Sequence, residues 1–179
     1  NFRVVGFTAV PTLEELARLV RRAGILLFDD LGSGALIDTR ELGLDEEPRV
    51  QDSVQAGADL VFFSGDKLLG GPQCGIVVGR AELVAKMRAH PLARALRVDK
   101  LTIAALAETL RAYAEGRHWQ EIPVLRMLRA DTTRQRRWAR RWARAAGEGG
   151  AVVTAESFVG GGSLPGSALP TACAALSWP

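Results

Sequence analysis

The chain has 179 residues, 47% hydrophobic and 24% charged, which is the composition of a globular protein able to bury a core. No stretch approaches the roughly 20 apolar residues that span a bilayer, and no signal-peptide pattern is present, so we expect a soluble, cytoplasmic protein. The two cysteines, Cys74 and Cys173, lie far apart without neighbouring His or Cys residues, which argues against a metal site and a disulfide framework. The apolar start without Met predicts an internal piece of a longer protein.

The elements predicted first form one βαβ unit. Residues Arg3–Phe7 read as a short strand, and a helix is predicted over Leu13–Ala23. Thr12 and Glu15 have the spacing of a capping box, and a glycine follows the helix. The apolar run Ile25–Phe28 is typical of a parallel strand buried on both faces.

A second unit follows the glycine-rich turn at residues 31–34. We predict a short helix over Asp52–Ala56 and strands over Asp59–Phe63 and Gly75–Gly79. Alternation of strands and helices over the first 80 residues predicts a layered α/β sheet.

The later part of the chain is predicted to be mainly helical. Helices are expected over Ala81–Ala89, over Lys100–Glu115 with Asp99 as its cap, and over Val124–Ala146. A strand at Val152–Thr154 and a glycine-rich, domain-joining loop follow. A change of character near residues 116–122 suggests two domains, 1–118 and 119–179.

Lys67 is the residue most indicative of chemistry. It lies in a turn between two predicted strands, and such strand ends hold ligands in open α/β sheets. A lysine amine held there can attack an aldehyde, and Ser64 can offer its hydroxyl to a phosphate. Asp29 and Asp30 follow the strand Ile25–Phe28, so we expect them to face the same pocket as Lys67.

Pyridoxal phosphate (PLP) requires this combination, because a carboxylate keeps its ring nitrogen protonated and a lysine binds it covalently. Of the two aspartates we favour Asp29 for the ring nitrogen. The residues also allow a plainer interpretation, in which Lys67 is a solvated surface lysine and the two aspartates belong to a turn.

Five strings of the sequence, in order along the chain, resemble bacterial selenocysteine synthase, the L-seryl-tRNA(Sec) selenium transferase family. The strings are Asp29-Asp-Leu-Gly-Ser-Gly34, Ser64-Gly-Asp-Lys-Leu-Leu-Gly-Gly-Pro-Gln73, Arg94-Ala-Leu-Arg-Val-Asp-Lys100, Glu121-Ile-Pro-Val-Leu-Arg-Met127 and Gly160-Gly-Gly-Ser-Leu-Pro-Gly166. The resemblance implies the type I, aspartate-aminotransferase-like PLP fold. Residues 1–118 would be the second half of its three-layer α/β/α large domain, and residues 119–179 an incomplete α+β small domain.

The resemblance also implies roles for particular residues. Lys67 matches the family's PLP lysine, Asp66 matches an active-site carboxylate, and Arg94 matches an arginine near the substrate or selenium-donor anion. Arg97 would assist Arg94 in substrate binding, whereas the residues alone favour a solvated pair at a helix start. Cys74 departs from the pattern, since a small residue such as Ala is expected there, but a buried Cys packs similarly.

The implied reaction is conversion of seryl-tRNA(Sec) to selenocysteinyl-tRNA(Sec), with PLP as cofactor and selenophosphate as selenium donor. The resemblance further implies a homo-oligomer, a ring of dimers, with neither membrane nor DNA as a partner. The chain alone would be incomplete as an enzyme. Two alternatives remain open: a PLP-dependent lyase acting on a small amino acid or amino sugar, and a non-catalytic RNA-binding or assembly module.

The second alternative depends on the segment from Arg126 to Ala146. It carries eight arginines and one aspartate, a local charge of +7 that leaves −4 for the rest of the chain. The arginines could bind RNA phosphates, but we favour a solubilising face or pairing with acids of a neighbouring subunit. The helical spacing predicts a core face, and the tryptophans are expected to be core or interface anchors. That face comprises Leu125, Leu128, Thr132, Gln135, Trp138, Trp142 and Ala145.

Overall fold

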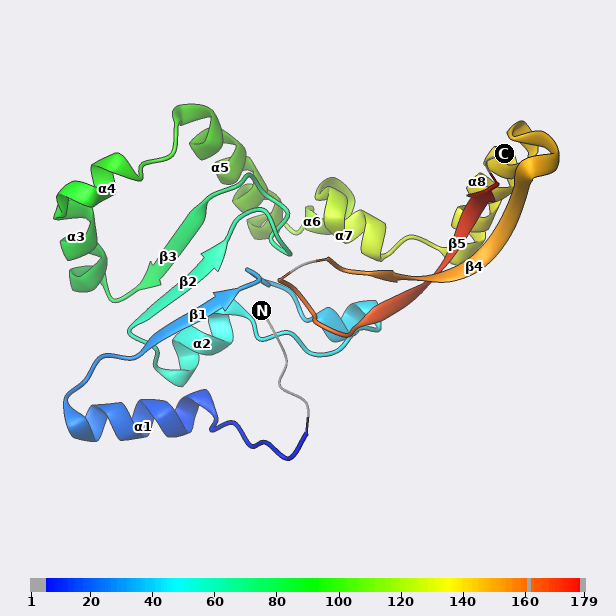
Figure 1. Ribbon diagram of the computed structural model, residues 1–179. Coiled ribbons are helices and arrows are strands. Elements are labelled where there is room, and N and C mark those ends of the chain that lie inside the picture. Colours follow the sequence, from blue (N-terminus) through cyan, green and yellow to red (C-terminus); the bar gives the residue numbers. More distant parts are fainter. Residues whose placement is uncertain (1–5, 161, 178–179) are drawn as a thin grey trace.

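The computed structural model describes residues 6–160 and 162–177. A three-stranded sheet with helices around it forms the larger part of the molecule, and a two-stranded ribbon extends away from it (Figure 1). The helices are α1 (Leu13–Ala23), α2 (Val50–Ala56), α3 (Ala81–Ala89), α4 (Pro91–Ala95), α5 (Lys100–Ala114), α6 (His118–Glu121), α7 (Pro123–Leu128) and α8 (Thr132–Ala145), with 3-10 turns η1 (Thr39–Leu42) and η2 (Gly147–Gly149). The strands are β1 (Phe28–Gly32), β2 (Leu60–Ser64), β3 (Gly75–Gly79), β4 (Gly150–Phe158) and β5 (Ala168–Leu176).

The main sheet is mixed, with strand order β1-β2-β3. β1 and β2 are parallel and are joined through α2, which confirms the second of the two predicted βαβ units. β3 pairs antiparallel with β2 directly after the Lys67 turn, without an intervening helix. The predicted α/β class is therefore confirmed, with a hairpin at one edge of the sheet.

Local signals in the sequence predicted several elements closely. α1 has the predicted bounds, with the Thr12–Glu15 capping box formed and Gly24 at φ 66° closing the helix. Asp99 caps α5 by accepting a hydrogen bond from the Thr102 amide at 2.8 Å. Short-range backbone and capping geometry is decided within a few residues, so a single sequence suffices for these elements.

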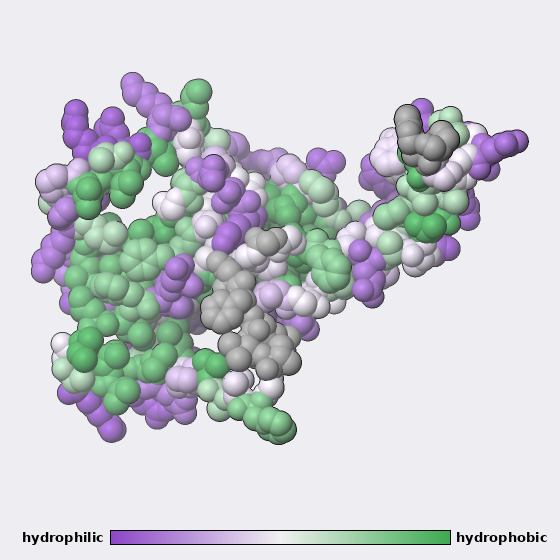
Figure 2. Space-filling view, in the orientation of Figure 1, coloured by the Kyte–Doolittle hydropathy of each residue, from purple (hydrophilic) through white to green (hydrophobic). Residues whose placement is uncertain are grey.

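The first two predicted strands differ from the structure. Residues 3–5 of the expected strand Arg3–Phe7 lie outside the described residues, and Gly6 and Phe7 are not in a strand. The strand predicted over Ile25–Phe28 begins only at Phe28, so that prediction was wrong in its bounds. It was also wrong about burial, because Ile25, Leu26 and Phe28 are 62%, 44% and 53% exposed. Figure 2 shows apolar surface exposed over this side of the main sheet.

The helix predicted over Val124–Ala146 is broken into α7 and α8. The break occurs because the Asp131 carboxylate accepts a hydrogen bond from the Thr133 amide at 2.9 Å and begins a new helix. The core face predicted for this segment was wrong at four positions, because Thr132 and Ala145 are exposed and Trp138 and Trp142 are 46% and 59% exposed. The buried positions of α8 are instead two alanines, Ala139 and Ala143.

The alanines are buried because α8 packs closely on the ribbon of β4 and β5. A Cβ on Gly150 would lie 2.1 Å from the Ala143 carbonyl oxygen, so the ribbon backbone approaches the α8 backbone too closely there for a side chain at position 150. β4 is longer than the predicted strand Val152–Thr154, and β5 was not predicted at all. The reason is that β5 contains Pro170 and several alanines, which have low strand propensity, and is held by antiparallel pairing with β4.

Candidate active site around Lys67

Lys67 lies in the tight turn that joins β2 to β3. The turn is closed by backbone hydrogen bonds from the Gly65 amide to the Cys74 carbonyl at 2.9 Å and from the Gly71 amide to the Gly65 carbonyl at 2.8 Å. A further bond runs from the Gly70 amide to the carbonyl of Lys67 itself at 2.9 Å. These bonds fix the backbone on both sides of the lysine.

The Lys67 turn is also bonded to the segment that follows β1. The Leu68 amide donates to the Ser33 carbonyl at 3.0 Å, and a Cβ on Gly34 would lie 2.6 Å from the Ser64 carbonyl oxygen. Gly34 has a φ of 69°, so both its conformation and its surroundings require glycine. The ends of β1 and β2 therefore lie side by side, as the parallel arrangement predicts.

Two later parts of the chain support the turn from its other side. The Tyr113 hydroxyl of α5 donates to the Leu69 carbonyl at 3.0 Å, and burial raises the pKa of this phenol. A Cβ on Gly70 would lie 2.4 Å from Ile122 Cγ2, so the turn packs directly on the segment before α7. Together these contacts hold Lys67 at a defined position.

Lys67 lines a pocket of about 430 Å³ between the turn, α7 and the β4–β5 loop. The lysine is half-buried, while Asp66 is exposed at the rim. The remaining lining residues among those described are Leu68, Gly70, Gly71, Pro123, Val124, Met127, Val159, Gly160 and Ser163.

The glycine-rich loop between β4 and β5 forms one wall of this pocket. A Cβ on Gly162 would lie 2.8 Å from Lys67 Nζ, so the lysine side chain lies directly against this glycine. The next residue, Ser163, is 5% exposed, and its hydroxyl has no hydrogen-bond partner among the described residues. Leu164 anchors the loop in a buried cluster with Leu68, and its amide donates to Glu47 Oε2 at 3.3 Å.

Sequence reasoning missed the part that this loop plays. It was expected to join two domains, whereas it connects β4 to β5 and contacts Lys67. Glycines and a serine in the string from Gly160 to Gly166 were the available signal. Nothing in the local sequence indicates that this string lies beside a residue almost a hundred positions earlier.

Asp29 and Asp30 both lie within β1 and do not follow the strand as expected. Because successive residues of a strand point to opposite faces, only one of them can face a given pocket. Asp29 is half-buried and Asp30 is exposed, and neither lines the pocket beside Lys67. Ser64 ends β2 and is half-buried, also outside the lining of this pocket.

Arg94 and Arg97 are exposed and lie in and just after α4. A helix break precedes Arg94, since His90 Nδ1 accepts a hydrogen bond from the Leu92 amide at 3.2 Å and Pro91 starts the helix. α3 and α4 follow the end of β3 that is opposite the Lys67 turn (Figure 1). Within this chain, the structure does not bring either arginine into the Lys67 pocket.

Cys74 closes the Lys67 turn and is not poised to act as a nucleophile. Burial, together with the nearby charge of Asp66, raises the pKa of its thiol. A protonated thiol packs as a small apolar group, in agreement with the small residue expected at this position.

Among the described residues, no group of three or more His, Cys, Asp or Glu side chains could hold a metal ion. In the same part of the chain, no helix is both long and apolar enough to cross a membrane.

The fold and the lysine-bearing turn define the class of this protein. It is an α/β protein with a mixed sheet and a half-buried lysine at a strand end, beside a pocket. The solved structure titled "Structure of D-Glucosaminate-6-phosphate Ammonia-lyase" has a similar fold, with a TM-score of 0.50 at 20% identity over 87% of this chain and 36% of that one.

The sequence comparisons identify the family. The family described as "SelA: L-seryl-tRNA selenium transferase" matches residues 1–178, so the chain belongs to this family, as its five strings predicted. Proteins named L-seryl-tRNA(Sec) selenium transferase from Hyphomonas neptunium and Geobacter metallireducens are each 48% identical to it, over 92% and 98% of this chain. The chain spans 37% and 40% of the lengths of these two relatives.

Proposed function

We propose that the protein, in its full length, converts seryl-tRNA(Sec) to selenocysteinyl-tRNA(Sec) in the cytoplasm, with PLP bound at Lys67 and selenophosphate as the selenium donor. The observation that carries the proposal is a half-buried lysine held beside a pocket in a chain of this family. We further propose that the mixed sheet belongs to the large domain of a type I PLP fold, over residues 1–118, and that residues 119–179 belong to the small domain.

The residues beside Lys67 fit such a cofactor. The buried Ser163 hydroxyl has no partner among the described residues, so it is available to a phosphate or hydroxyl of a bound group. Gly70, Gly71 and Gly160 line the same pocket. Because glycine has no side chain, a bound cofactor can approach their backbone closely. We also propose that one of the two β1 aspartates holds the ring nitrogen, from a position outside the residues that line the Lys67 pocket, and Asp29 is favoured because it is the more buried of the two.

When bound, PLP supplies an electron sink for charge that develops on the α-carbon of an amino acid. The chain's own residues would position and protonate the substrate. The Lys67 amine is suited to move the proton at the seryl α-carbon, since the turn fixes its backbone and Gly162 limits its side chain. Asp66, exposed at the rim beside it, would orient the incoming substrate.

Arg94 and Arg97 are proposed to bind an anion of the substrate or selenium donor, because a guanidinium can bind a phosphate through two parallel hydrogen bonds. Both lie away from the Lys67 pocket of their own chain, so we propose that they act on the pocket of a second copy in the homo-oligomer. Mixed oligomers of a Lys67→Ala and an Arg94→Ala subunit should then regain activity that neither variant has alone. No regain in verified mixed oligomers would count against action across subunits.

The main test of the proposal is chemical. Borohydride reduction of the full-length holoenzyme should fix the cofactor on Lys67, located by mass spectrometry, and Lys67→Ala should abolish both the label and selenium transfer to tRNA. Lys86→Ala, which removes an exposed lysine from α3, serves as the matched control and should leave both unchanged. A label on another lysine would refute the assignment, and turnover of free amino acids or amino sugars without tRNA would indicate the lyase alternative.

A further inference from the structure

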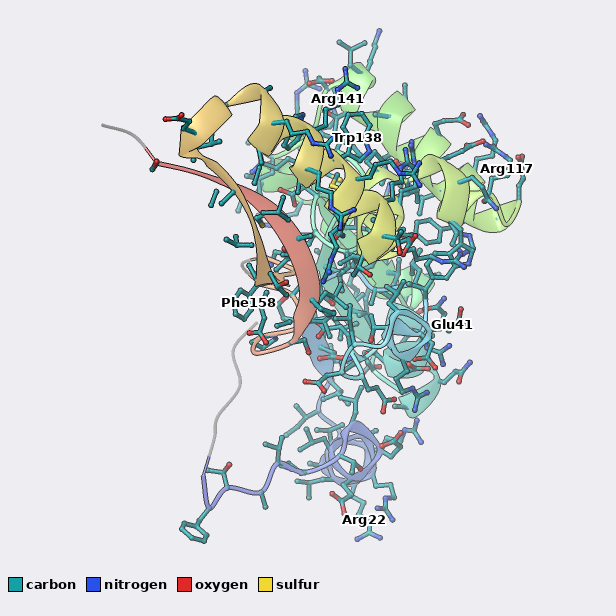
Figure 3. The ribbon with its side chains drawn as sticks, turned by 90° about the vertical axis from the view of Figure 1, so that its right-hand side faces the viewer. Arg22, Glu41, Arg117, Trp138, Arg141 and Phe158 are labelled. Atoms are coloured by element: carbon teal, nitrogen blue, oxygen red, sulfur yellow. The ribbon has the colours of Figure 1, made fainter. Side chains whose placement is uncertain are left out.

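α8 is strongly basic, with six arginines and no acid in its 14 residues. α8 is fixed to the ribbon by its buried alanines and by Gln135, whose Oε1 accepts a hydrogen bond from Thr171 Oγ1 at 3.1 Å. The other side of the helix therefore faces solvent, and Figure 3 shows Arg141 and Trp138 projecting from it. The arginines of α8 are Arg134, Arg136, Arg137, Arg140, Arg141 and Arg144.

These arginines are not neutralised within the described chain. No carboxylate among the described residues forms an ion pair with any of them, whereas Arg40, Arg49, Arg80, Arg111 and Arg117 each pair with an acid. Asp131, the acid that precedes the helix, is engaged as its cap, and Glu148, which follows the helix, forms no ion pair with these arginines. Uncompensated positive charge at this density favours a polyanionic partner.

Two tryptophans on the same helix distinguish this face from a merely solubilising one. Trp138 and Trp142 are about half exposed, with ring centroids 6.2 Å apart. The Arg141 guanidinium lies 5.8 Å from the Trp138 ring centroid. Exposed aromatic rings beside guanidinium groups provide flat surfaces on which unstacked nucleic-acid bases can pack.

The arginines are also spaced to follow a phosphate backbone. Arg134, Arg137 and Arg141 are three and four residues apart, which places the Cβ atoms of neighbouring members about 5–6 Å apart on one strip of the helix. Together with Trp138 and the capping Asp131 they line a single hollow in the surface. The 14-residue helix is about 21 Å long, enough to contact several phosphates at once.

We propose that the face of α8 formed by Arg134, Arg137, Arg141, Trp138 and Trp142, here called the arginine–tryptophan face, docks RNA. The arginines contact the phosphates of the RNA and the tryptophans pack against its bases. The inference rests on the proposed function in one respect, namely that the RNA is the tRNA substrate. It assigns part of tRNA binding to a surface separate from the Lys67 pocket.

The test measures the affinity of the full-length protein for a transcribed, fluorescently labelled tRNA(Sec) by anisotropy at several salt concentrations. The variant Arg134→Gln/Arg137→Gln/Arg141→Gln should bind tRNA about 10- to 100-fold more weakly near 0.1 M salt. The negative slope of log K against log salt should become shallower by about one for each arginine–phosphate pair removed. Lysine at the same three positions should keep the slope. The matched control, Arg18→Gln/Arg22→Gln/Arg88→Gln, removes the same charge from α1 and α3 and should bind normally.

The tryptophans give an independent measurement. Trp138→Leu/Trp142→Leu should weaken binding about 10-fold while leaving the salt slope unchanged, because base stacking is not an ionic contact. Unchanged affinity and slope in the triple Gln variant would overturn the proposal. So would a change in its sedimentation coefficient without tRNA, since the face would then be a contact between subunits.

Labelling of Lys67 by borohydride in the same samples separates the two proposals. If Lys67 is not labelled but the triple Gln variant loses tRNA affinity, the proposed function fails and the RNA-docking face stands. If Lys67 is labelled and tRNA affinity is unchanged, the RNA-docking face fails alone.

Discussion

Gly162 lies directly against Lys67, although the two residues are far apart in the sequence. A Cβ at Gly162 would lie 2.8 Å from Lys67 Nζ and 3.0 Å from its Cε. The contact joins the β2–β3 turn to the β4–β5 loop and makes the loop a wall of the candidate active site. The position and freedom of the lysine amine therefore depend on a residue from the C-terminal part of the chain.

Gly162→Ala should weaken cofactor binding, whereas its loss of unfolding free energy should match that of a control variant. The new methyl group would displace the Lys67 side chain, so we expect weaker PLP absorbance and a fall in cofactor affinity of about tenfold or more. Gly166→Ala is the matched control, because its φ of 87° is close to the 84° of Gly162 and nothing lies within 4 Å of the new Cβ. Each variant should lose about 1 kcal/mol of stability from the left-handed backbone. Equal cofactor affinity in the two variants would count against the contact.

Gly70→Ala tests how tightly the Lys67 turn packs on the segment before α7. The added Cβ would lie 2.4 Å from Ile122 Cγ2 and 2.8 Å from Val124 Cγ1. We expect a loss of unfolding free energy about 1–3 kcal/mol greater than that of Gly43→Ala, measured by urea denaturation. Gly43 has nearly the same φ, 72° against 73°, but open space around it, so the difference isolates the packing. Equal losses of unfolding free energy in the two variants would show that Ile122 and Val124 move aside without an energetic penalty.

Tyr113→Phe should destabilise the Lys67 turn and change the response to alkaline pH. Loss of the bond to the Leu69 carbonyl should cost about 1 kcal/mol at neutral pH. The pKa of Tyr113 is raised in the folded state by burial, so the folded protein keeps this proton where the unfolded chain loses it. The wild type should accordingly lose unfolding free energy as the pH rises above about 10, and Tyr113→Phe should lose less. Parallel alkaline curves for the two proteins would contradict this assignment.

Asp59→Asn should loosen the start of β1 in a pH-dependent manner. Asp59 Oδ1 lies 2.8 Å from an Arg80 guanidinium nitrogen, and its Oδ2 accepts a hydrogen bond from the Leu27 amide at 2.7 Å. The bonds to Arg80 and then Leu27 lower the pKa of this carboxyl, so its contribution is present above the unfolded pKa and is lost as the pH falls through the lower folded value. We expect a loss of about 1–2 kcal/mol at pH 7, shrinking as the pH is taken below about 4 in denaturation experiments. A difference that is constant with pH would rule out the carboxylate as its source.

The sequence by itself determined the features that depend on a few neighbouring residues. The capping box of α1, the Asp99 cap of α5 and the bounds of β3 follow from local side-chain and backbone preferences, and the family follows from strings that are short and ordered. The position of Lys67 at a strand end also followed, because the apolar runs on either side of it predict two strands.

Only the tertiary structure decided which distant segments meet. It paired the alanine-rich β5 with β4, buried Ala139 and Ala143 rather than the tryptophans of α8, and brought Gly162 against Lys67. Such contacts depend on the shapes of surfaces that are far apart in the chain, and side-chain periodicity predicts which face of a helix is apolar but not which face a neighbour covers. In α8 the side that packs on the ribbon carries Ala139 and Ala143, and the larger aromatic residues remain exposed beside the arginines.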